Sequence, residues 1–317
     1  MRGVMGRVWR DALGAMGFVS AFIAATGAGL GWGGDFDWRL DVLTHFAPIY
    51  AGVGLLAALA GVAAGRPWRP PSVLLGVVAM LCAGGLMWPE YARYVEPAAA
   101  PAAAGRIKIV QFNAFKRNID LDRVAAWIAA QDADIVTLQE ARHDLRDALV
   151  KRMGYQVAGS KEHVMILSRR PRLRMVRPPL DASPLTYVNA TYPSESGPFE
   201  VMTTHLDWPL YDTHPRQLTD LASVVARRPR ERMILTGDFN STPWSFGLRR
   251  ADAALGLIRR DRALFSFPTH IDRWDQPPPV LPIDHVYAGP GWRTVSIERG
   301  PDLGSDHYPL VVILAPR

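Results

Sequence analysis

The chain has 317 residues, of which 49% are hydrophobic and 21% charged, so it has the composition of a folded protein and not of a disordered one. Its single cysteine excludes a disulfide within the chain, and a net charge of +6 does not by itself indicate nucleic-acid binding. The length allows two domains, or one domain with an appendage.

The N-terminal part, residues 1–94, contains three windows without a charged residue. They cover residues 12–33, 42–65 and 70–89. Each window can cross a hydrocarbon core about 30 Å thick as a helix, for which about 20 residues suffice. We therefore predict an all-α membrane anchor of three transmembrane helices.

Basic residues predict the orientation of this anchor. A cleaved signal peptide is the alternative for the first window, because Arg2, Arg7 and Arg10 precede it, but the length of that window and the two further windows favour a retained anchor. Arg66 and Arg69 lie between the second and third windows. The positive-inside rule therefore places the N-terminus and the connection between these two windows in the cytoplasm. Three crossings then predict a multi-pass protein of the bacterial inner membrane, with the rest of the chain on the periplasmic or extracellular side.

An Ala/Pro linker, VEPAAAPAAAG, occupies residues 95–105 and is expected to be extended or semi-rigid. Short apolar strands and amphipathic helices alternate over residues 106–317, which we take as a second domain. The expected helices span residues 121–130, 143–153 and 215–226, and the expected strands 108–112, 135–138, 164–167, 186–192, 199–204, 233–235, 286–287, 294–297 and 308–314. This mixture predicts an α/β (α+β) sandwich and not a purely parallel sheet.

Polar residues recur at the ends of these apolar strands. Asn113, Glu140 and Asp306 are hard oxygen donors without a nearby thiolate, which suits Mg²⁺, Mn²⁺ or Ca²⁺ better than zinc. His205 and His307 can transfer a proton or bind phosphate.

Two further aspartates complete the pattern. Asp238 and Asp284 can each orient an imidazole or an attacking water. Such groups suit in-line attack on phosphorus, where catalysis consists mainly of positioning and charge neutralisation. A structural core has no use for them, because burying an unbonded polar group costs about 2–7 kcal/mol.

The motifs LQE, THL, GDFNSTP, IDH and SDHYPL, in this order and spacing, resemble the endonuclease/exonuclease/phosphatase superfamily. That superfamily includes deoxyribonuclease I, abasic-site endonucleases, neutral sphingomyelinases and inositol polyphosphate 5-phosphatases. The resemblance runs from about Ile107 to the C-terminus and looks like the bacterial membrane-anchored members. It implies a four-layered αββα sandwich with the site at one edge of two facing sheets.

The resemblance also implies a metal site. Glu140 is expected to be the principal ligand of Mg²⁺ (or Mn²⁺), helped by Asn113 and Asp306. The number of ions, one or two, stays open.

Catalytic roles follow from the same resemblance. Asp238 is expected to align or deprotonate the attacking water, and Asn240 to hold water or phosphate. His307, paired with Asp284, is expected to be the general base or the group that polarises the phosphate, and His205 to donate to a non-bridging oxygen.

Competing interpretations remain for single residues. Asn240 and Ser241 can instead cap the following helix, as these residue types often do. His285 is expected to be structural. Phe115 stands where abasic-site enzymes usually carry a second acid, so that branch is disfavoured.

The sequence therefore predicts a membrane-anchored, divalent-metal-dependent phosphoesterase that cleaves phosphodiester bonds with an activated water. Nucleic acid and a phospholipid-like ester are both open as substrates, the lipid bilayer is the other partner, and no obligate protein partner is inferred. The alternative is a catalytically silent binding module of the same fold. A calcineurin-like metallophosphatase is excluded because its Gly-Asn-His-Asp/Glu and Gly-His-x-His elements do not occur.

Overall fold

The computed structural model describes residues 2–64, 66–159, 164–176, 184–271 and 274–317. The chain forms two compact units. Unit 1 comprises Met1–Arg93 and Pro243–Arg249, and unit 2 comprises Tyr94–Thr242 and Arg250–Arg317.

Unit 1 is helical. Its N-terminal part contains α1 (Arg2–Gly31), the 3-10 helix η1 (Trp32–Asp35), α2 (Trp38–Thr44), α3 (Ala47–Ala63) and α4 (Arg69–Ala92). Small residues lie where these helices meet: a Cβ on Gly54 of α3 would lie 2.7 Å from the carbonyl oxygen of Gly76 on α4. This close approach is the packing that small residues permit between apolar helices.

Two of these helical segments, Val8–Asp35 and Arg69–Ala92, are long and apolar enough to cross a membrane. The second predicted window differs from expectation, because it is not one helix: α2 and α3 meet at a bend of 55° and qualify as a span only as a pair. Pro48 lies in the first turn of α3 and explains the break, because proline has no N–H and disfavours helical backbone in the residue before it.

Unit 2 contains two mixed six-stranded sheets. The first sheet has the order β13-β14-β1-β2-β4-β3, with bounds Trp292–Arg299, Leu310–Pro316, Ile107–Asn113, Ile135–Gln139, Met165–Ser168 and Gln156–Gly159. The second has the order β5-β6-β7-β8-β12-β9, with bounds Arg174–Val176, Thr186–Tyr192, Phe199–His205, Met233–Asp238, Asp284–Ala288 and Ile258–Arg259. A separate hairpin pairs β10 (His270–Ile271) with β11 (Trp274–Asp275).

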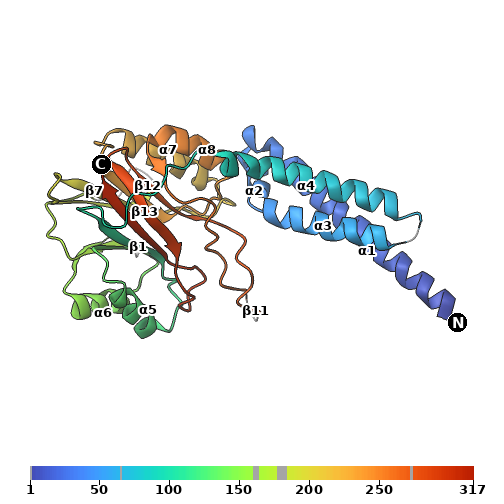
Figure 1. Ribbon diagram of the computed structural model, residues 1–317, viewed down its shortest axis with the longest axis horizontal. Coiled ribbons are helices and arrows are strands. Elements are labelled where there is room, and N and C mark those ends of the chain that lie inside the picture. The colour runs from blue at the N-terminus through green and yellow to red at the C-terminus, as the bar shows by residue number, and fades with distance from the viewer. Residues whose placement is uncertain (1, 65, 160–163, 177–183, 272–273) are drawn as a thin grey trace. The chain divides into compact units, whose positions relative to one another are not determined.

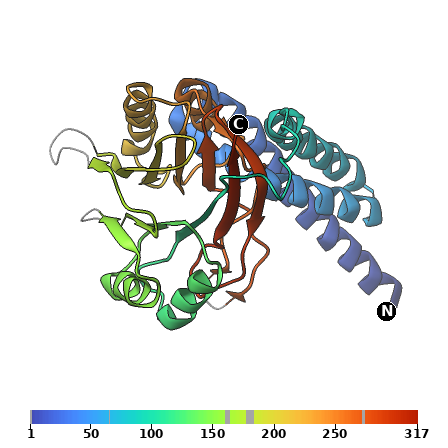
Figure 2. The same cartoon turned by 60° about the vertical axis from the view of Figure 1, so that its left-hand side comes forward.

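Helices cover the outer faces of the two sheets. Figures 1 and 2 show α5 (Leu121–Ala130) and α6 (His143–Met153), in green, on the side of the sheets away from α7 (Thr213–Ala226). A further helix, α8 (Phe246–Leu255), begins in the unit 1 segment and continues into unit 2. The layers of unit 2 confirm the predicted αββα sandwich.

Alternation along the strands explains the layers. On β1, Ile107 and Ile109 are buried in the core between the sheets, whereas Val110 and Phe112 are buried in the core beneath α5 and α6. Successive strand residues point to opposite faces, so a strand that is buried on both sides reads as a continuous apolar run. The same pattern made these strands recognisable in the sequence.

The predicted linker is bound to unit 2 along part of its length. The Glu96 carboxylate lies 2.7 Å from the Arg317 guanidinium and 3.5 Å from that of Arg293. The N–H of Ala99 donates to the carbonyl of Thr294 at 2.7 Å. Residues 93–95 are therefore the only ones between the end of α4 and this anchored segment.

Candidate active site

The inward faces of the central strands change from apolar to polar toward one end of the sandwich. In chain order, the inward residues are Ile109, Gln111 and Asn113 on β1; Ile135, Thr137 and Gln139 on β2; Val201, Thr203 and His205 on β7; Ile234, Thr236 and Asp238 on β8; and Asp284 and Val286 on β12. Apolar residues thus hold the sheets together in the middle. Polar side chains take their place where the site begins.

A layer of hydrogen bonds joins the two sheets directly beneath the site. Thr236 Oγ1 donates to Thr137 Oγ1 at 2.9 Å, and Gln139 Nε2 donates to Thr203 Oγ1 at 2.8 Å. All four side chains are fully buried, where an unmet polar group is costly. This layer fixes the position of one sheet relative to the other at the site.

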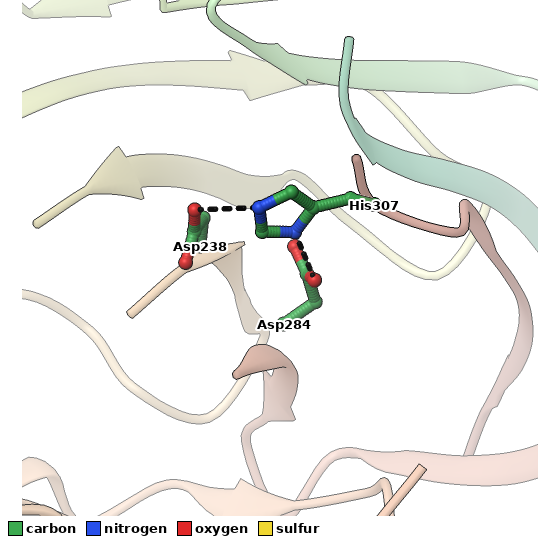
Figure 3. Close-up of side chains that lie close together, drawn as sticks. All are labelled: Asp238, Asp284 and His307. Atoms are coloured by element: carbon green, nitrogen blue, oxygen red, sulfur yellow. Dashed lines mark hydrogen bonds and ion pairs between the residues drawn. The ribbon is translucent and has the colours of Figure 1, made fainter. Parts of the chain in front are cut away.

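The centre of the site is an imidazole between two carboxylates, drawn in Figure 3. His307 Nδ1 lies 2.7 Å from Asp284 Oδ2, and His307 Nε2 lies 3.6 Å from Asp238 Oδ2. Asp238 and Asp284 are paired across β8 and β12, which places their side chains on one face. Gln111 Nε2 donates to the other oxygen of Asp284 at 3.0 Å and fixes that carboxylate.

Charge coupling sets the protonation of this group. Burial alone would lower the pKa of His307, but the Asp284 and Asp238 carboxylates raise it to about 10. Burial acts to raise the pKa of Asp284, yet the charge and hydrogen bond of His307 outweigh it and lower that pKa. Burial raises the pKa of Asp238, with Asp284 adding to the effect. Near pH 7, His307 is therefore an imidazolium bound to an ionised Asp284.

Asp238 is also the point where further predicted residues meet. Asn113 Nδ2 donates to Asp238 Oδ2 at 2.9 Å, and His205 Nε2 lies 3.6 Å from the same oxygen. His205 Nε2 is also 3.9 Å from Glu140 Oε1. The first sheet supplies Asn113 and Glu140, and the second supplies His205 and Asp238, so the site lies between the two.

Two hydrogen bonds fix Asn240, one from its backbone N–H and one from its side-chain amide. Its N–H donates to Asp238 Oδ1 at 2.8 Å, and its Nδ2 donates to the carbonyl of Leu206 at 2.8 Å. Its Oδ1 is buried, and no hydrogen-bond partner for it is found among the described residues. An unpartnered buried acceptor at the edge of the site is suited to accept a hydrogen bond from a water molecule.

Strained backbone marks the ends of three strands at the site. Phe115, Glu140 and Asn240 have φ angles of 55°, 49° and 48°, and follow β1, β2 and β8. Left-handed backbone is uncommon for residues other than glycine and is often found at functional sites.

Gly237 has a related constraint. Its φ is 151°, and a Cβ at this position would lie 2.2 Å from the carbonyl oxygen of Thr204. The glycine therefore lets β7 and β8 approach immediately before Asp238.

The remaining acidic residues form a donor set that fits a divalent cation. Burial raises the pKa of Asp306, and the Glu140 carboxylate raises it further, against an opposing effect of His307. Asn113 Oδ1 accepts from the N–H of Phe115 at 3.1 Å, which orients the amide. Carboxylate and amide oxygens are hard donors of the type that Mg²⁺ and Mn²⁺ take.

Asp238, Asp284 and His307 are another group with the residue types of a metal site. Their ligand atoms lie within 4.8 Å of one another. His307 is hydrogen-bonded to Asp284 at 2.7 Å and lies 3.6 Å from Asp238, so its charge accounts for these three residues without an ion. The fit is better at Glu140 and Asp306, for which the described residues show no hydrogen-bonded imidazole.

The structure thus brings together all eight residues singled out in the sequence: Asn113, Glu140, His205, Asp238, Asn240, Asp284, Asp306 and His307. Sequence reasoning missed Gln111. Its signal was its place two residues before Asn113, which puts it on the same strand face.

Two expectations about neighbouring residues can be compared with the structure. Asn240 and Ser241 do not cap a helix, because α8 begins only at Phe246 and the hydroxyl of Ser245 accepts from the N–H of Leu248. His285 is buried away from the site, as expected. Its Nδ1 lies 2.8 Å from Asp261.

The sequence profile described as the endonuclease/exonuclease/phosphatase family matches residues 110–307. No curated protein matches the chain.

Solved structures share the fold of unit 2. An endonuclease/exonuclease/phosphatase protein from Bacteroides vulgatus is 18% identical, with a TM-score of 0.54, over 67% of this chain and 99% of its own. TDP2 of D. rerio, complexed with a single-strand DNA product, is 16% identical, with a TM-score of 0.55, over 66% of this chain and 98% of its own. The human nocturnin catalytic domain, with bound sulfate, is 20% identical, with a TM-score of 0.54, over 72% of this chain and 99% of its own.

Proposed function

Since the chain belongs to the endonuclease/exonuclease/phosphatase family and is a metal-dependent hydrolase of phosphoric esters, we propose that it is a membrane-anchored phosphodiesterase. The observation that carries the proposal is that Asp238, His205, His307 and Glu140 lie within 3.6–3.9 Å of one another in a chain of contacts that joins the two sheets. Residues 1–94 are proposed to anchor it in the bacterial inner membrane. Residues 106–317 are proposed to act on the periplasmic or extracellular side.

We assign the proton-transfer role to Asp238. Its Oδ2 lies 3.6 Å from both His205 Nε2 and His307 Nε2, which is longer than a hydrogen bond. A water beside this carboxylate can be oriented by the free Oδ1 of Asn240 and can transfer its proton to Asp238.

The two histidines are assigned to the phosphate. His307 is charged because Asp284 holds it, so it donates to a phosphoryl oxygen through Nε2 and does not serve as the base. His205 donates from the end of β7, beside Asp238 on β8. Hydrogen-bond donors fixed in this way stabilise the negative charge that develops on phosphorus oxygens in the transition state.

Glu140, Asp306 and Asn113 are proposed to hold Mg²⁺ or Mn²⁺. When bound, the ion neutralises charge on the phosphoryl group and its leaving oxygen. The Lys116 N–H lies 3.3 Å from Glu140 Oε2 and helps to orient that carboxylate.

The test uses the full-length protein in detergent with Mg²⁺ or Mn²⁺. Plasmid DNA, RNA, a phospholipid panel and bis(p-nitrophenyl) phosphate are assayed, with Glu140→Gln as the inactive control. Turnover that Glu140→Gln abolishes, while its melting temperature stays near that of the wild type, supports the proposal. Absence of turnover on every substrate would favour the silent binding module instead.

A further inference from the structure

Two loops at the active-site end of unit 2 carry exposed apolar side chains. Among the described residues after 105, Trp208, Leu210 and Tyr211 are 43%, 68% and 60% exposed, and Ile119 is 93% exposed. All four lie on two loops, one following β1 and one following β7. Other large apolar residues exposed in this part of the chain, Leu173 and Ile258, lie singly.

Both loops border the proposed site. The first continues from Asn113, and the N–H of Lys116 within it donates to Glu140. The second follows His205 directly. Its Trp208 ring lies 5.6 Å from the ring of Phe267, which in turn lies 5.0 Å from the ring of His307.

The second loop is ordered although its apolar side chains project into solvent. Gln217 Oε1 accepts from the N–H of Asp207 at 2.7 Å, and the Thr213 hydroxyl donates to Asp207 Oδ2 at 2.5 Å. The N–H of Tyr211 donates to the carbonyl of Trp208 at 3.0 Å. A fixed loop that keeps large apolar groups in water is typical of an interaction surface.

The first loop adds charge to this surface. Lys116 and Arg117 are exposed next to Ile119. Lys and Arg beside exposed apolar groups suit an anionic bilayer, because the cations meet lipid phosphates while the apolar tips enter the acyl boundary. In the second loop, Asp212 pairs with Arg216 at 3.6 Å, and Asp207 accepts a hydrogen bond from the neutral Thr213 hydroxyl and keeps its charge.

A bilayer is also the partner that the chain itself supplies. α4 is long and apolar enough to span a membrane, and residues 93–95 link its end to Glu96, which pairs with Arg317 at the strand ends opposite the site. We infer that the loop residues Ile119, Trp208, Leu210 and Tyr211, with Lys116 and Arg117, form a surface that docks on an anionic phospholipid bilayer and exposes the site to phosphoesters of lipids in it. The docking stands by itself, and only the access of lipid phosphoesters to the site rests on the proposed function.

The position of the surface is tested on the full-length protein in nanodiscs of phosphatidylglycerol and phosphatidylcholine. Cys82 is the only cysteine, so a Cys82→Ala background accepts a single new thiol. Leu210→Cys carries an environment-sensitive fluorophore. Leu173→Cys is the matched control, because Leu173 is 61% exposed and lies far along β6 from His205. Its N–H donates to the carbonyl of Thr191, whereas His205 pairs with Thr186 at the other end of β6.

The fluorophore at residue 210 is expected to shift to the blue and to be quenched by spin-labelled lipid, whereas the one at residue 173 is not. Equal quenching at both positions, or none at residue 210, overturns the docking surface. This readout needs no enzymatic activity. Failure of the proposed function and failure of this inference are therefore separable.

Kinetics test the consequence for the substrate. Leu210→Glu is expected to raise KM for a phospholipid substrate in vesicles about tenfold and to leave turnover of bis(p-nitrophenyl) phosphate unchanged. Leu173→Glu is expected to change neither. If Leu210→Glu instead slows hydrolysis of DNA or RNA and leaves lipid hydrolysis intact, the loop is a surface for stacking bases and the inference is wrong.

Discussion

Replacing Asp284 by Asn tests whether the aspartate and His307 act as one unit. The change keeps the shape of the side chain and removes its charge. With an effective dielectric constant of about 20, unit charges 2.7 Å apart interact by about 6 kcal/mol. Gln111 and His307 both donate to Asp284. The NH₂ of the asparagine must face one of them, so one hydrogen bond is replaced by two donors facing each other. We expect kcat/KM to fall about 10³–10⁴-fold, equivalent to about 4–5.5 kcal/mol.

The assay is hydrolysis of bis(p-nitrophenyl) phosphate at pH 7 with saturating Mg²⁺, together with thermal unfolding of each variant. The structure offers a matched control, because Asp261 and His285 form a second buried pair at 2.8 Å. Asp261→Asn is expected to lower the melting temperature but to leave kcat of the folded protein within about twofold, since surface and structural changes away from the site act on stability.

A double variant decides the question of coupling. If Asp284 works by holding His307, Asp284→Asn combined with His307→Gln will be no more than about threefold slower than His307→Gln alone. A loss below about tenfold for Asp284→Asn, or rate losses that multiply in the double variant, would refute the reasoning.

Three further outcomes are expected. EDTA should abolish activity, and Mn²⁺ or Mg²⁺ should restore it to the wild type but not to Glu140→Gln; activity that persists in chelator contradicts the metal site. Gly237→Ala should lower the free energy of unfolding by about 3 kcal/mol or more, measured by denaturant titration, because its Cβ meets the Thr204 carbonyl; a change below about 1 kcal/mol contradicts the close approach of β7 and β8. Burial acts against ionisation of Asp261, but His285 lowers the pKa of Asp261 to about 2. The stabilising effect of the Asp261 charge is therefore present above pH about 4 and is lost as the pH falls toward 2. Asp261→Asn should flatten the dependence of the melting temperature on pH over that range.

Much of the fold was accessible from the sequence because its signals are local. Strand alternation and amphipathic periodicity predicted helices at residues 121–130 and 143–153 with the bounds that the structure has. The missed elements are mostly short: β9, β10 and β11 have two residues each, too few for a periodic pattern. The break between α2 and α3 was missed although Pro48 signals it, because apolar composition alone does not distinguish one helix from two.

The site residues were predicted as a set because each lies at the end of an apolar strand. The sequence by itself determined which chemical groups are present, in which order, and on which strand face each lies, because side chains alternate with a period of two. It did not determine their mutual contacts. The bond from Gln111 to Asp284 joins residues 173 positions apart.

Only the tertiary structure decided that His307 lies between Asp284 and Asp238, and that Asp261 engages His285 instead of entering the site. The Asp261–His285 pair depends on the pairing of β9 with β12 within the second sheet. The position of His307 depends on how the two sheets face one another, because it precedes β14 of the first sheet whereas Asp238 and Asp284 lie on β8 and β12 of the second. Strand periodicity contains no information on that arrangement, which comes from packing of the apolar core between the sheets and from the threonine and glutamine hydrogen bonds across it. The charge on His307 follows from the same arrangement, because a pKa responds to the distance and burial of its neighbours and not to their order in the chain.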